Sequence, residues 1–231
     1  MASVAARSLF PFICVGCGRE QPRSHLCSSC RDTLFRYINI RCPACGKRLP
    51  EGKLCDGCSV KLWAKRFIYT FPYPHPIGKA VIHSLKYNFI RDLAPPLGAA
   101  LAHAIHITVP DWRRHDLLAV PIPLAKARLN WRGFNHAQLI AQTTAAALGI
   151  PMETTALLRT RKTRAQRTLP RAERFENIAS AFIVENKHRI GGRTILLIDD
   201  VATTGATLKE AAITLKQNGA RAVWCAAVAK E

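Results

Sequence analysis

The apolar positions near the carboxyl terminus predict a buried strand followed by a helix. Ile195–Ile198 form an unbroken apolar run, which is typical of a central parallel strand covered on both faces. Apolar side chains then recur at helical spacing, at Leu208, Ala211, Ala212 and Leu215. Gly219 stands where the end of a helix favours a residue that tolerates positive φ. We therefore expect a strand, a loop and a helix between Thr194 and Gly219.

A second unit of the same kind is predicted upstream. Leu117–Val120 form another short apolar run, and a helix is expected over residues 135–148. Asn135 is suited to cap the start of that helix, and Gly149 is suited to end it. The repeated order of strand, loop and helix predicts an α/β fold in which helices flank a parallel sheet.

The loop of the carboxyl-terminal unit has the composition of a phosphate cradle, which we assign to Ala202, Thr203, Thr204, Gly205, Ala206 and Thr207. Ligands of open α/β sheets sit beyond the carboxyl ends of the strands, where free N–H groups and the helix dipole favour an anion. The loop contains no Lys or Arg, so its donors would be backbone amides and threonine hydroxyls, with Gly205 permitting close approach of the backbone.

Two carboxylates precede this loop, at Asp199 and Asp200. Beside a phosphate they would be repulsive unless they accept hydrogen bonds from sugar hydroxyls or hold a hard cation such as Mg²⁺. A ribose 5-phosphate with Mg²⁺ satisfies both halves of the motif. The alternative is an acidic pair at a strand end, followed by an ordinary threonine-rich turn.

The loop of the upstream unit is basic and stiffened by prolines. Lys126, Arg128 and Arg132 lie between the run Pro121-Ile122-Pro123 and the predicted helix. This composition suits a site that receives pyrophosphate rather than the sugar, and Arg132 is the best single cationic candidate. The alternative is a surface arginine paired with an acid elsewhere.

The cysteines predict a duplicated metal-binding module in the amino-terminal third. Eight of the nine cysteines form C-x-x-C pairs, at Cys14/Cys17, Cys27/Cys30, Cys42/Cys45 and Cys55/Cys58. The set repeats after 28 positions, as from Cys14 to Cys42, and the matches extend to Gly18/Gly46 and Leu26/Leu54. Four thiolates from two turns suit a closed, tetrahedral, structural Zn²⁺ site, so two zinc ions are expected.

We assign one ion to each copy of the repeat, although a crossed arrangement of the pairs stays open. A disulfide framework would need an oxidising compartment, and residues 1–13 do not resemble an export signal, so zinc and a cytoplasmic location are favoured. The module should fold only around its metals and serve docking rather than catalysis. His25 is expected at the surface, and Cys225 is expected to be a buried structural thiol.

The length and charge of the chain indicate its domain organisation and the kind of ligand it attracts. The 231 residues suit a zinc module over residues 1–62 and a medium-sized domain over residues 63–231, and no apolar run approaches a membrane span. The net charge of +19 predicts attraction to polyphosphates or nucleic acid. Much of it lies in the stretch Arg159–Arg174, which we expect to be a mobile basic loop. Closure over pyrophosphate, contact with a nucleic-acid backbone and a merely solvated surface all stay open for this loop.

The strand, the two aspartates and the Thr-Thr-Gly loop resemble the signature of type I phosphoribosyltransferases, which bind phosphoribosyl pyrophosphate. The stretch WRGFNHAQLIA at residues 131–141, with VPIP before it and IDDVATTGAT after it, resembles the ComF family of competence-associated proteins and its GntX-like members. The segment His83–Tyr87 belongs to the same pattern. His136 departs from it, because the family more often has Gln there, as does Asn88-Phe89, which replaces a turn that commonly contains Gly.

The resemblance implies a double zinc ribbon before a phosphoribosyltransferase-like domain, with Mg²⁺–phosphoribosyl pyrophosphate as ligand. Asp199, Asp200 and Arg132 would then be catalytic, Asp199 and Asp200 would orient the ribose and the magnesium, and Lys126 would help to bind the pyrophosphate. It also implies a link to DNA uptake and to proteins of the competence machinery. The acceptor substrate cannot be identified from these residues.

Two functions therefore compete. One is a phosphoribosyltransferase, and the other is a non-catalytic nucleotide sensor that binds single-stranded DNA through its zinc ribbons and basic loop. Trp63, Trp112, Trp131 and Trp224 are scattered along the chain. The sequence therefore favours electrostatic contact with DNA over stacking on its bases.

Overall fold

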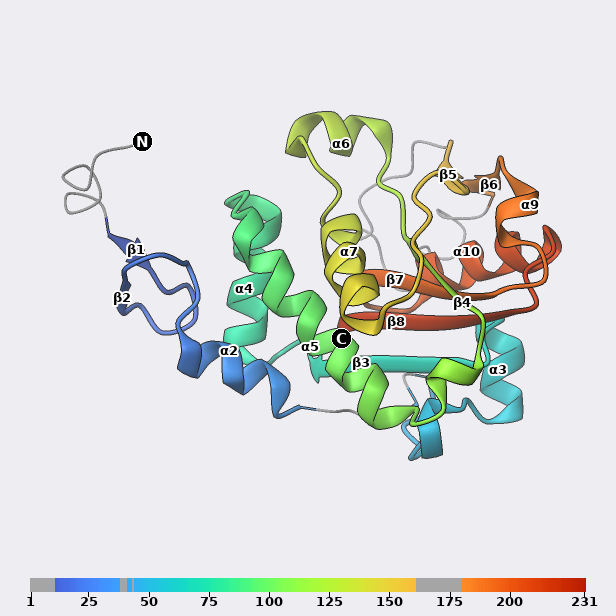
Figure 1. Cartoon of the computed structure of the whole chain (residues 1–231), viewed down its shortest axis with the longest axis horizontal. Coiled ribbons are helices and arrows are strands. Elements are labelled where there is room, and N and C mark those ends of the chain that lie inside the picture. The colour runs from blue at the N-terminus through green and yellow to red at the C-terminus, as the bar shows by residue number, and fades with distance from the viewer. Residues whose placement is uncertain (1–10, 38–40, 43, 161–179) are drawn as a thin grey trace.

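A computed structural model describes residues 11–37, 41–42, 44–160 and 180–231 of the chain. Its centre is a parallel sheet in the order β3-β8-β7-β4, flanked by helices (Figure 1). The strands of this sheet are β3 (Arg66–Pro72), β4 (Leu117–Pro121), β7 (Thr194–Ala202) and β8 (Ala222–Lys230). The expected α/β fold and the central position of the strand at Ile195–Ile198 are confirmed.

Smaller elements surround the sheet. Two antiparallel pairs join β1 (Phe12–Ile13) to β2 (Glu20–Gln21) and β5 (Leu157–Arg159) to β6 (Phe182–Val184). The longer helices are α2 (Ser28–Phe35), α3 (Asp56–Leu62), α4 (Pro76–Tyr87), α5 (Ala94–Thr108), α6 (Lys126–Arg132), α7 (His136–Leu148) and α10 (Ala206–Gln217). Short helical turns are η1 (Pro50–Gly52), η2 (Arg91–Leu93), η3 (Trp112–Arg114) and α9 (Lys187–Ile190).

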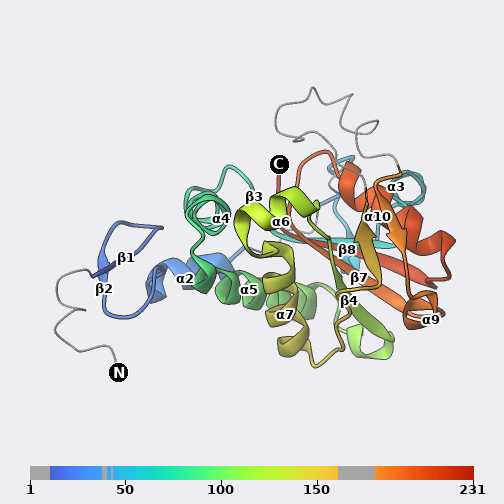
Figure 2. The ribbon, with the colours of Figure 1, turned by 90° about the horizontal axis from the view of Figure 1, so that it is seen from above.

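Alternation along β7 divides the core into two layers. Leu196 and Ile198 pack with α5 and α7, whereas Ile195 and Leu197 pack with α10 on the opposite face. Figure 2 shows the helices on the two sides of the sheet. Because both faces are covered, the strand can be apolar throughout, as its unbroken run predicted.

The second strand–loop–helix unit is also confirmed. β4 covers the predicted strand, and Asn135 caps α7 by accepting a hydrogen bond from the amide of Ala137 at 3.1 Å. Gly149 ends α7 with a φ of 66°. The loop between them differs from the prediction, because it contains α6, a short helix with no buried residues. A helix without an apolar face gives no periodic signal in the sequence.

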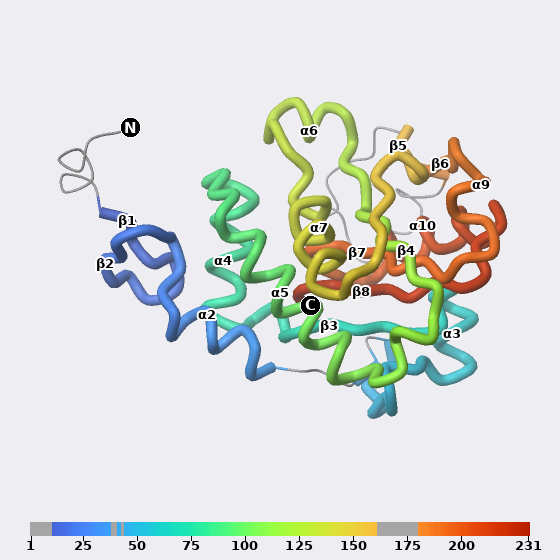
Figure 3. The backbone as a smooth tube through the Cα atoms, in the orientation of Figure 1, coloured from blue at the N-terminus to red at the C-terminus, as the bar shows by residue number. Residues whose placement is uncertain are grey.

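The two zinc-ribbon copies lie on opposite faces of the sheet, at separate ends of the molecule in the backbone trace (Figure 3). Leu34 of α2 is buried in the layer that contains α5, and Leu62 of α3 is buried in the layer that contains α10. These two leucines are 28 positions apart, so they occupy the same place in the repeat. The duplicated module thus supplies equivalent apolar side chains to both layers.

The predicted basic loop falls almost wholly outside the described residues, which omit 161–179. Its first residue, Arg159, is not part of a mobile loop, because it lies in β5 and pairs with Phe182 of β6. Among the helices in the described part of the chain, none is long and apolar enough to cross a membrane.

Candidate functional site

The predicted phosphate cradle, residues 202–207, comprises the last residue of β7, a three-residue turn and the first two residues of α10, and is called the phosphate turn below. Gly205 adopts a left-handed conformation with φ 79°, and the amide of Ala206 donates to the Thr204 hydroxyl at 3.3 Å. The turn borders a small hollow of about 180 Å³, partly open to solvent. The hollow is lined by Asp199, Val201, Ala202, Thr203, Gly205, Ala206, Thr207 and Leu208. Amides at the start of a twelve-residue helix, together with hydroxyls, make this hollow suitable for a phosphate.

The second zinc-ribbon copy lies next to this turn. A methyl group placed on Gly205 would lie 3.6 Å from Cδ2 of Leu62, in ordinary van der Waals contact. Leu62 is the last residue of α3, whose Cys58 belongs to the second cysteine cluster. The phosphate turn and the metal-binding module therefore share one packed interface.

The two aspartates have different surroundings, because they point to opposite faces of β7. Asp199 lines the hollow beside the phosphate turn. Asp200 is buried on the other face, where its Oδ1 atom lies 2.8 Å from Nζ of Lys86 in α4. Its Oδ2 atom contacts Nε2 of His136 in α7. The sequence analysis assigned the same role to both aspartates, whereas in the structure Asp199, and not Asp200, lines the hollow.

Burial and neighbouring charges separate the pKa values of the pair. Burial, together with the charge of Asp200, raises the pKa of Asp199 from 3.8 to about 7. Burial alone would also raise the pKa of Asp200, but the contact with His136 and the ion pair with Lys86 lower it well below its usual range. At neutral pH, Asp200 is therefore a fixed anion, and Asp199 is poised to exchange a proton or bind a cation.

Replacing Asp199 with asparagine is expected to stabilise the protein at about pH 8, by on the order of 2 kcal/mol. Because the folded-state pKa near 7 exceeds the unfolded value of 3.8, folding favours the protonated carboxyl. The stability that Asp199 contributes is fully present below about pH 4 and is lost as the pH rises through about 7. Urea unfolding of the wild type and of Asp199→Asn at about pH 8 and about pH 4 measures the difference between their free energies of unfolding. An equal difference at both would contradict the raised pKa.

A chain of polar contacts links Arg132 of α6 through His136 to Asp200. Burial lowers the pKa of His136, with partial compensation by Asp200, so the imidazole is neutral at neutral pH. Nη1 of Arg132 lies 3.1 Å from Nδ1 of His136, and an arginine can only donate. The proton of His136 then lies on Nε2, the atom that contacts Oδ2 of Asp200. His136 is thus a buried partner of both predicted site residues and not a solvent-facing histidine.

Three arginines, Arg128, Arg132 and Arg159, are linked by their electrostatic interactions, and Arg159 also interacts with Asp199. Burial and the charge of Arg128 lower the pKa of Arg159 to about 10, while Asp199 opposes this shift. Burial and the charge of Arg132 lower the pKa of Arg128 in turn. A pKa lowered by burial and by a neighbouring cation indicates guanidinium groups that are close together and partly dehydrated, an arrangement that a phosphate or pyrophosphate would stabilise. Lys126, by contrast, is exposed at the start of α6.

The cysteines gather into the two predicted clusters. Ligand atoms of Cys14, Cys17, Cys27 and Cys30 lie within 4.8 Å of one another, as do those of Cys42, Cys45 and Cys58. Cys55 completes the second set, because its sulfur is 3.9 Å from that of Cys45. The amides of Gly18 and Gly46 donate to the carbonyls of Cys14 and Cys42 in equivalent turns. Each copy thus offers four sulfurs, which fits two structural zinc ions.

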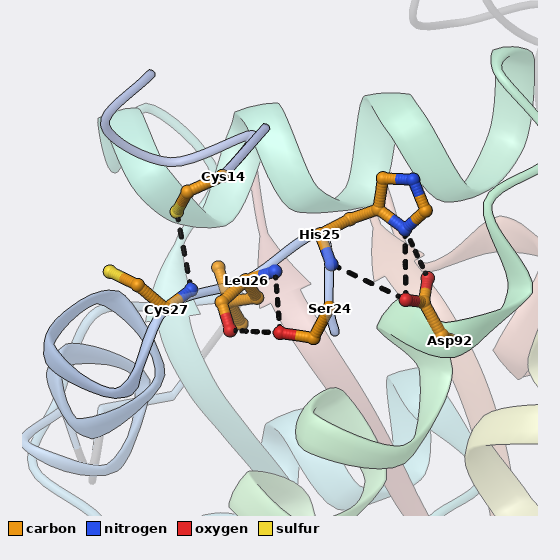
Figure 4. Close-up of polar contacts among 6 residues, drawn as sticks. All are labelled: Cys14, Ser24, His25, Leu26, Cys27 and Asp92. Carbon is orange, nitrogen blue, oxygen red and sulfur yellow. Dashed lines mark hydrogen bonds and ion pairs between the residues drawn. The ribbon is translucent and has the colours of Figure 1, made fainter. Parts of the chain in front are cut away.

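His25 lies beside the first cluster without joining it. Its Nδ1 atom is 2.8 Å from Oδ2 of Asp92 in η2, and its backbone amide donates to the same carboxylate at 3.3 Å (Figure 4). The amide of Cys27 donates to the sulfur of Cys14 at 3.3 Å in the same region. His25 therefore fastens the first ribbon to the α4–α5 connection. Cys225 is buried in β8, as predicted.

Lys86 is the site residue that sequence reasoning overlooked. It follows Ile82 by four positions in α4, so it falls on the apolar side of a helix in which Val81, Ile82 and Leu85 are buried. A lysine on such a face predicts a buried acid as its partner. The sequence gives no indication that this acid is Asp200, 114 positions later.

Comparison with known proteins agrees with this architecture. A family model described as "Double zinc ribbon domain" matches residues 5–59, and one described as "Phosphoribosyl transferase domain" matches residues 136–231. The chain is 33% identical to DNA utilization protein YhgH of Escherichia coli over 168 residues, 70% of this chain and 71% of the relative. It is 34% identical to Competence protein F of Haemophilus influenzae over 125 residues, 52% of this chain and 55% of the relative.

The similarity to Competence protein ComFC of Bacillus subtilis is lower but spans nearly both chains, with 27% identity over 242 aligned positions and 95% coverage of each. The order of a double zinc ribbon and a phosphoribosyltransferase domain, the paired cysteine clusters and these relatives all agree. The chain therefore belongs to the ComF/GntX family of double-zinc-ribbon phosphoribosyltransferase-domain proteins.

Proposed function

We propose that this protein binds Mg²⁺–phosphoribosyl pyrophosphate and transfers its phosphoribosyl group to an acceptor during the use of external DNA. The observation that carries the proposal is the hollow at the end of β7, where Asp199 faces the amides and hydroxyls of the phosphate turn. The DNA context comes from the relatives, whose names refer to DNA utilization and competence.

Each part of the ligand has a matching group in this site. The 5-phosphate would lie on the turn Ala202–Thr207, and the ribose hydroxyls would face Asp199. The pyrophosphate would lie toward Arg128, Arg132 and Arg159, whose neighbouring positive charges would attract an anion. Asp199 as a single available carboxylate suits Mg²⁺, which typically takes one or two protein oxygens together with substrate phosphates.

These residues would act mainly by positioning and electrostatics. Bound Mg²⁺ would supply charge neutralisation for the departing pyrophosphate. Asp200, held by Lys86 and His136, would fix the end of β7, and the Arg132–His136 contact would place the guanidinium beside the leaving group. Asp199, with a pKa near 7, would be ionised in the presence of a cation and so able to bind it.

The deciding experiment measures ligand affinity by calorimetry and pyrophosphate release with a panel of acceptors. Asp199→Asn is expected to weaken binding of Mg²⁺–phosphoribosyl pyrophosphate about 10- to 100-fold, as for loss of one charged hydrogen-bonding group. Asp32→Asn, which changes an exposed carboxylate on α2, is the matched control. Undiminished affinity in Asp199→Asn would overturn the assignment. Tight binding without pyrophosphate release would favour a nucleotide sensor over a transferase.

A specific observation favours a second candidate function, binding of single-stranded DNA. Phe89 and Trp131 come from different parts of the chain but meet with ring centroids 5.4 Å apart at an interplanar angle of 73°. They are 41% and 60% exposed. The guanidinium of Arg132 lies 5.6 Å from the Trp131 ring, on the projecting helix α6 (Figure 1). Exposed aromatic rings beside cations suit stacked bases and their phosphates.

Replacing Trp131 with alanine is expected to weaken binding of an oligothymidylate of about 20 nucleotides roughly tenfold, the loss associated with one stacked base. Fluorescence anisotropy measures the affinity, and Trp63→Ala is the control for removal of an exposed tryptophan elsewhere. An abasic oligonucleotide of the same length should bind both proteins equally. If the abasic strand binds wild type as tightly as oligothymidylate does, contact is purely electrostatic and the stacking surface is wrong.

A further inference from the structure

An apolar groove lies on the second zinc-ribbon copy, away from the phosphate turn. It is lined by Ser59, Val60, Trp63, Ala64, Lys65, Lys216, Ala222 and Val223, with a volume of about 590 Å³ open to solvent. Ala222 and Val223 are at the amino end of β8, whereas the phosphate turn follows the carboxyl end of β7. A molecule in this groove would therefore leave the proposed ligand site open.

Two apolar side chains remain uncovered at the rim. Val60 is 72% exposed and Trp63 is 44% exposed. Large exposed apolar residues that are adjacent to one another, rather than scattered, are characteristic of interaction surfaces. The backbone at Trp63 is also unusual, because α3 ends there in a left-handed conformation with φ 54° and ψ 28°. Non-glycine residues adopt this conformation rarely, and strained residues of this kind cluster at binding sites.

The duplication supplies an internal comparison for this surface. Trp63 corresponds to Phe35 of the first copy, which is the last residue of α2 and packs against the core. The ring of Phe35 lies 5.7 Å from that of His103 in α5, so the chain itself covers it. Val60 corresponds to Asp32, which is exposed and polar. The first copy thus exposes a polar residue and packs its aromatic ring against the core, whereas the second copy exposes apolar side chains at both equivalent positions.

The charges at the groove determine what kind of partner fits it. Two of its lining residues, Lys65 and Lys216, are basic, and none is acidic. Two further exposed cations are close in sequence to lining residues, since Lys61 follows Val60 and Arg221 precedes Ala222. Nζ of Lys216 is held in place by the Arg221 carbonyl at 2.7 Å. Apolar walls favour side-chain anchors over a sugar–phosphate backbone, and the basic rim favours flanking carboxylates.

We propose that this groove docks an acidic peptide segment of a partner protein, which inserts a leucine or aromatic side chain between Val60 and Trp63. The proposal concerns the second zinc-ribbon copy and does not depend on the function proposed for the phosphate turn.

The test is selection of displayed random peptides on the full-length, zinc-loaded protein, with Val60→Asp as counter-target. Val60→Asp introduces the residue that the first copy has at the equivalent position, Asp32, and Val60 is exposed, so the variant should fold normally. Unchanged zinc content and an unchanged thermal unfolding temperature would verify this. We expect enrichment of peptides with Asp or Glu around Leu, Phe or Trp. A synthetic peptide of the enriched sequence should bind Val60→Asp and Trp63→Ser at least about tenfold more weakly.

The reciprocal variant Asp32→Val, on the first copy, should leave the affinity of the selected peptide unchanged. Absence of enrichment over the counter-target, or enrichment of basic peptides, would overturn the proposal. Displacement of the peptide by oligothymidylate, with weaker oligothymidylate binding in Val60→Asp, would show that the groove belongs to a nucleic-acid surface instead.

Discussion

Replacing Cys58 with serine is expected to weaken phosphate binding about tenfold or more, and the same change at Cys30 should weaken it much less. Both residues are buried and occupy equivalent places in the repeat, so each variant should lose one of two zinc ions. The difference arises from packing. Leu62, four positions after Cys58, lies beside Gly205, where an added methyl group would be 3.6 Å from its Cδ2 atom, and α3 packs against α10. The helix α2 of the first copy packs against α4 and α5 instead. Metal binding by such modules contributes on the order of 10 kcal/mol to their folding, so its loss should disorder α3.

Elemental analysis and calorimetry with ribose 5-phosphate test this prediction together. Each variant should contain one zinc per chain, and only Cys58→Ser should show the large loss of affinity. Cys30→Ser is the matched control, because it removes the same chemical group from the sister module. Equal losses of affinity in both variants would mean that the modules affect the site through overall stability alone. A zinc content near zero in reduced wild-type protein would contradict the metal assignment itself.

Replacing Lys86 with methionine is expected to destabilise the protein by about 3 to 5 kcal/mol at neutral pH, the range for breaking a buried ion pair. The change keeps the length and apolar stem of the side chain but leaves Asp200 with His136 as its remaining partner. Lys79→Met, at an exposed position of the same helix, should have little effect. Adding Asp200→Asn to Lys86→Met should recover part of the loss, which a double-mutant cycle measures as a coupling energy.

The pH dependence of this effect has a definite sign. The folded-state pKa of Asp200 lies below its unfolded value of 3.8, so its ionised form contributes stability that is present above about pH 4. That contribution is lost as the pH falls through the folded-state pKa, and the difference between wild type and Lys86→Met should shrink in the same window. Urea unfolding at about pH 7 and about pH 3 tests this. A constant difference would show that packing of the Lys86 stem, and not its charge, stabilises the site.

The sequence predicted the elements whose signals are local. An unbroken apolar run identified β7, helical spacing identified α10, and the cysteine repeat identified both clusters. The extent of β7 was underestimated, because Asp199 and Asp200 continue the strand, and Asp199 pairs with Ala227 of β8 despite its charge. Strand alternation then separates the two side chains, a consequence that follows from period-two geometry once the strand is known to continue.

Contacts between residues that are far apart in the sequence could not be predicted, because no local sequence pattern indicates them. Lys86 of α4 meets Asp200 of β7, and Phe89, in the connection that follows α4, meets Trp131 of α6. The scattered tryptophans suggested no stacking surface, yet one of them gains an aromatic neighbour when the chain folds. The arginine-rich stretch beyond Thr160 lies outside the described residues, so its proposed contacts stay predictions.

The order of the elements along the chain has a consequence for synthesis. Both zinc-ribbon copies precede every strand of the four-stranded sheet, although each copy contributes buried side chains to one layer of its core. During translation, Leu34 and Leu62 therefore emerge before the surfaces that will bury them, and metal capture can organise both modules in advance. The four strands would then assemble after both zinc-ribbon modules have folded. Zinc supply during translation should consequently govern the yield of folded protein more strongly than zinc supplied after the chain is complete.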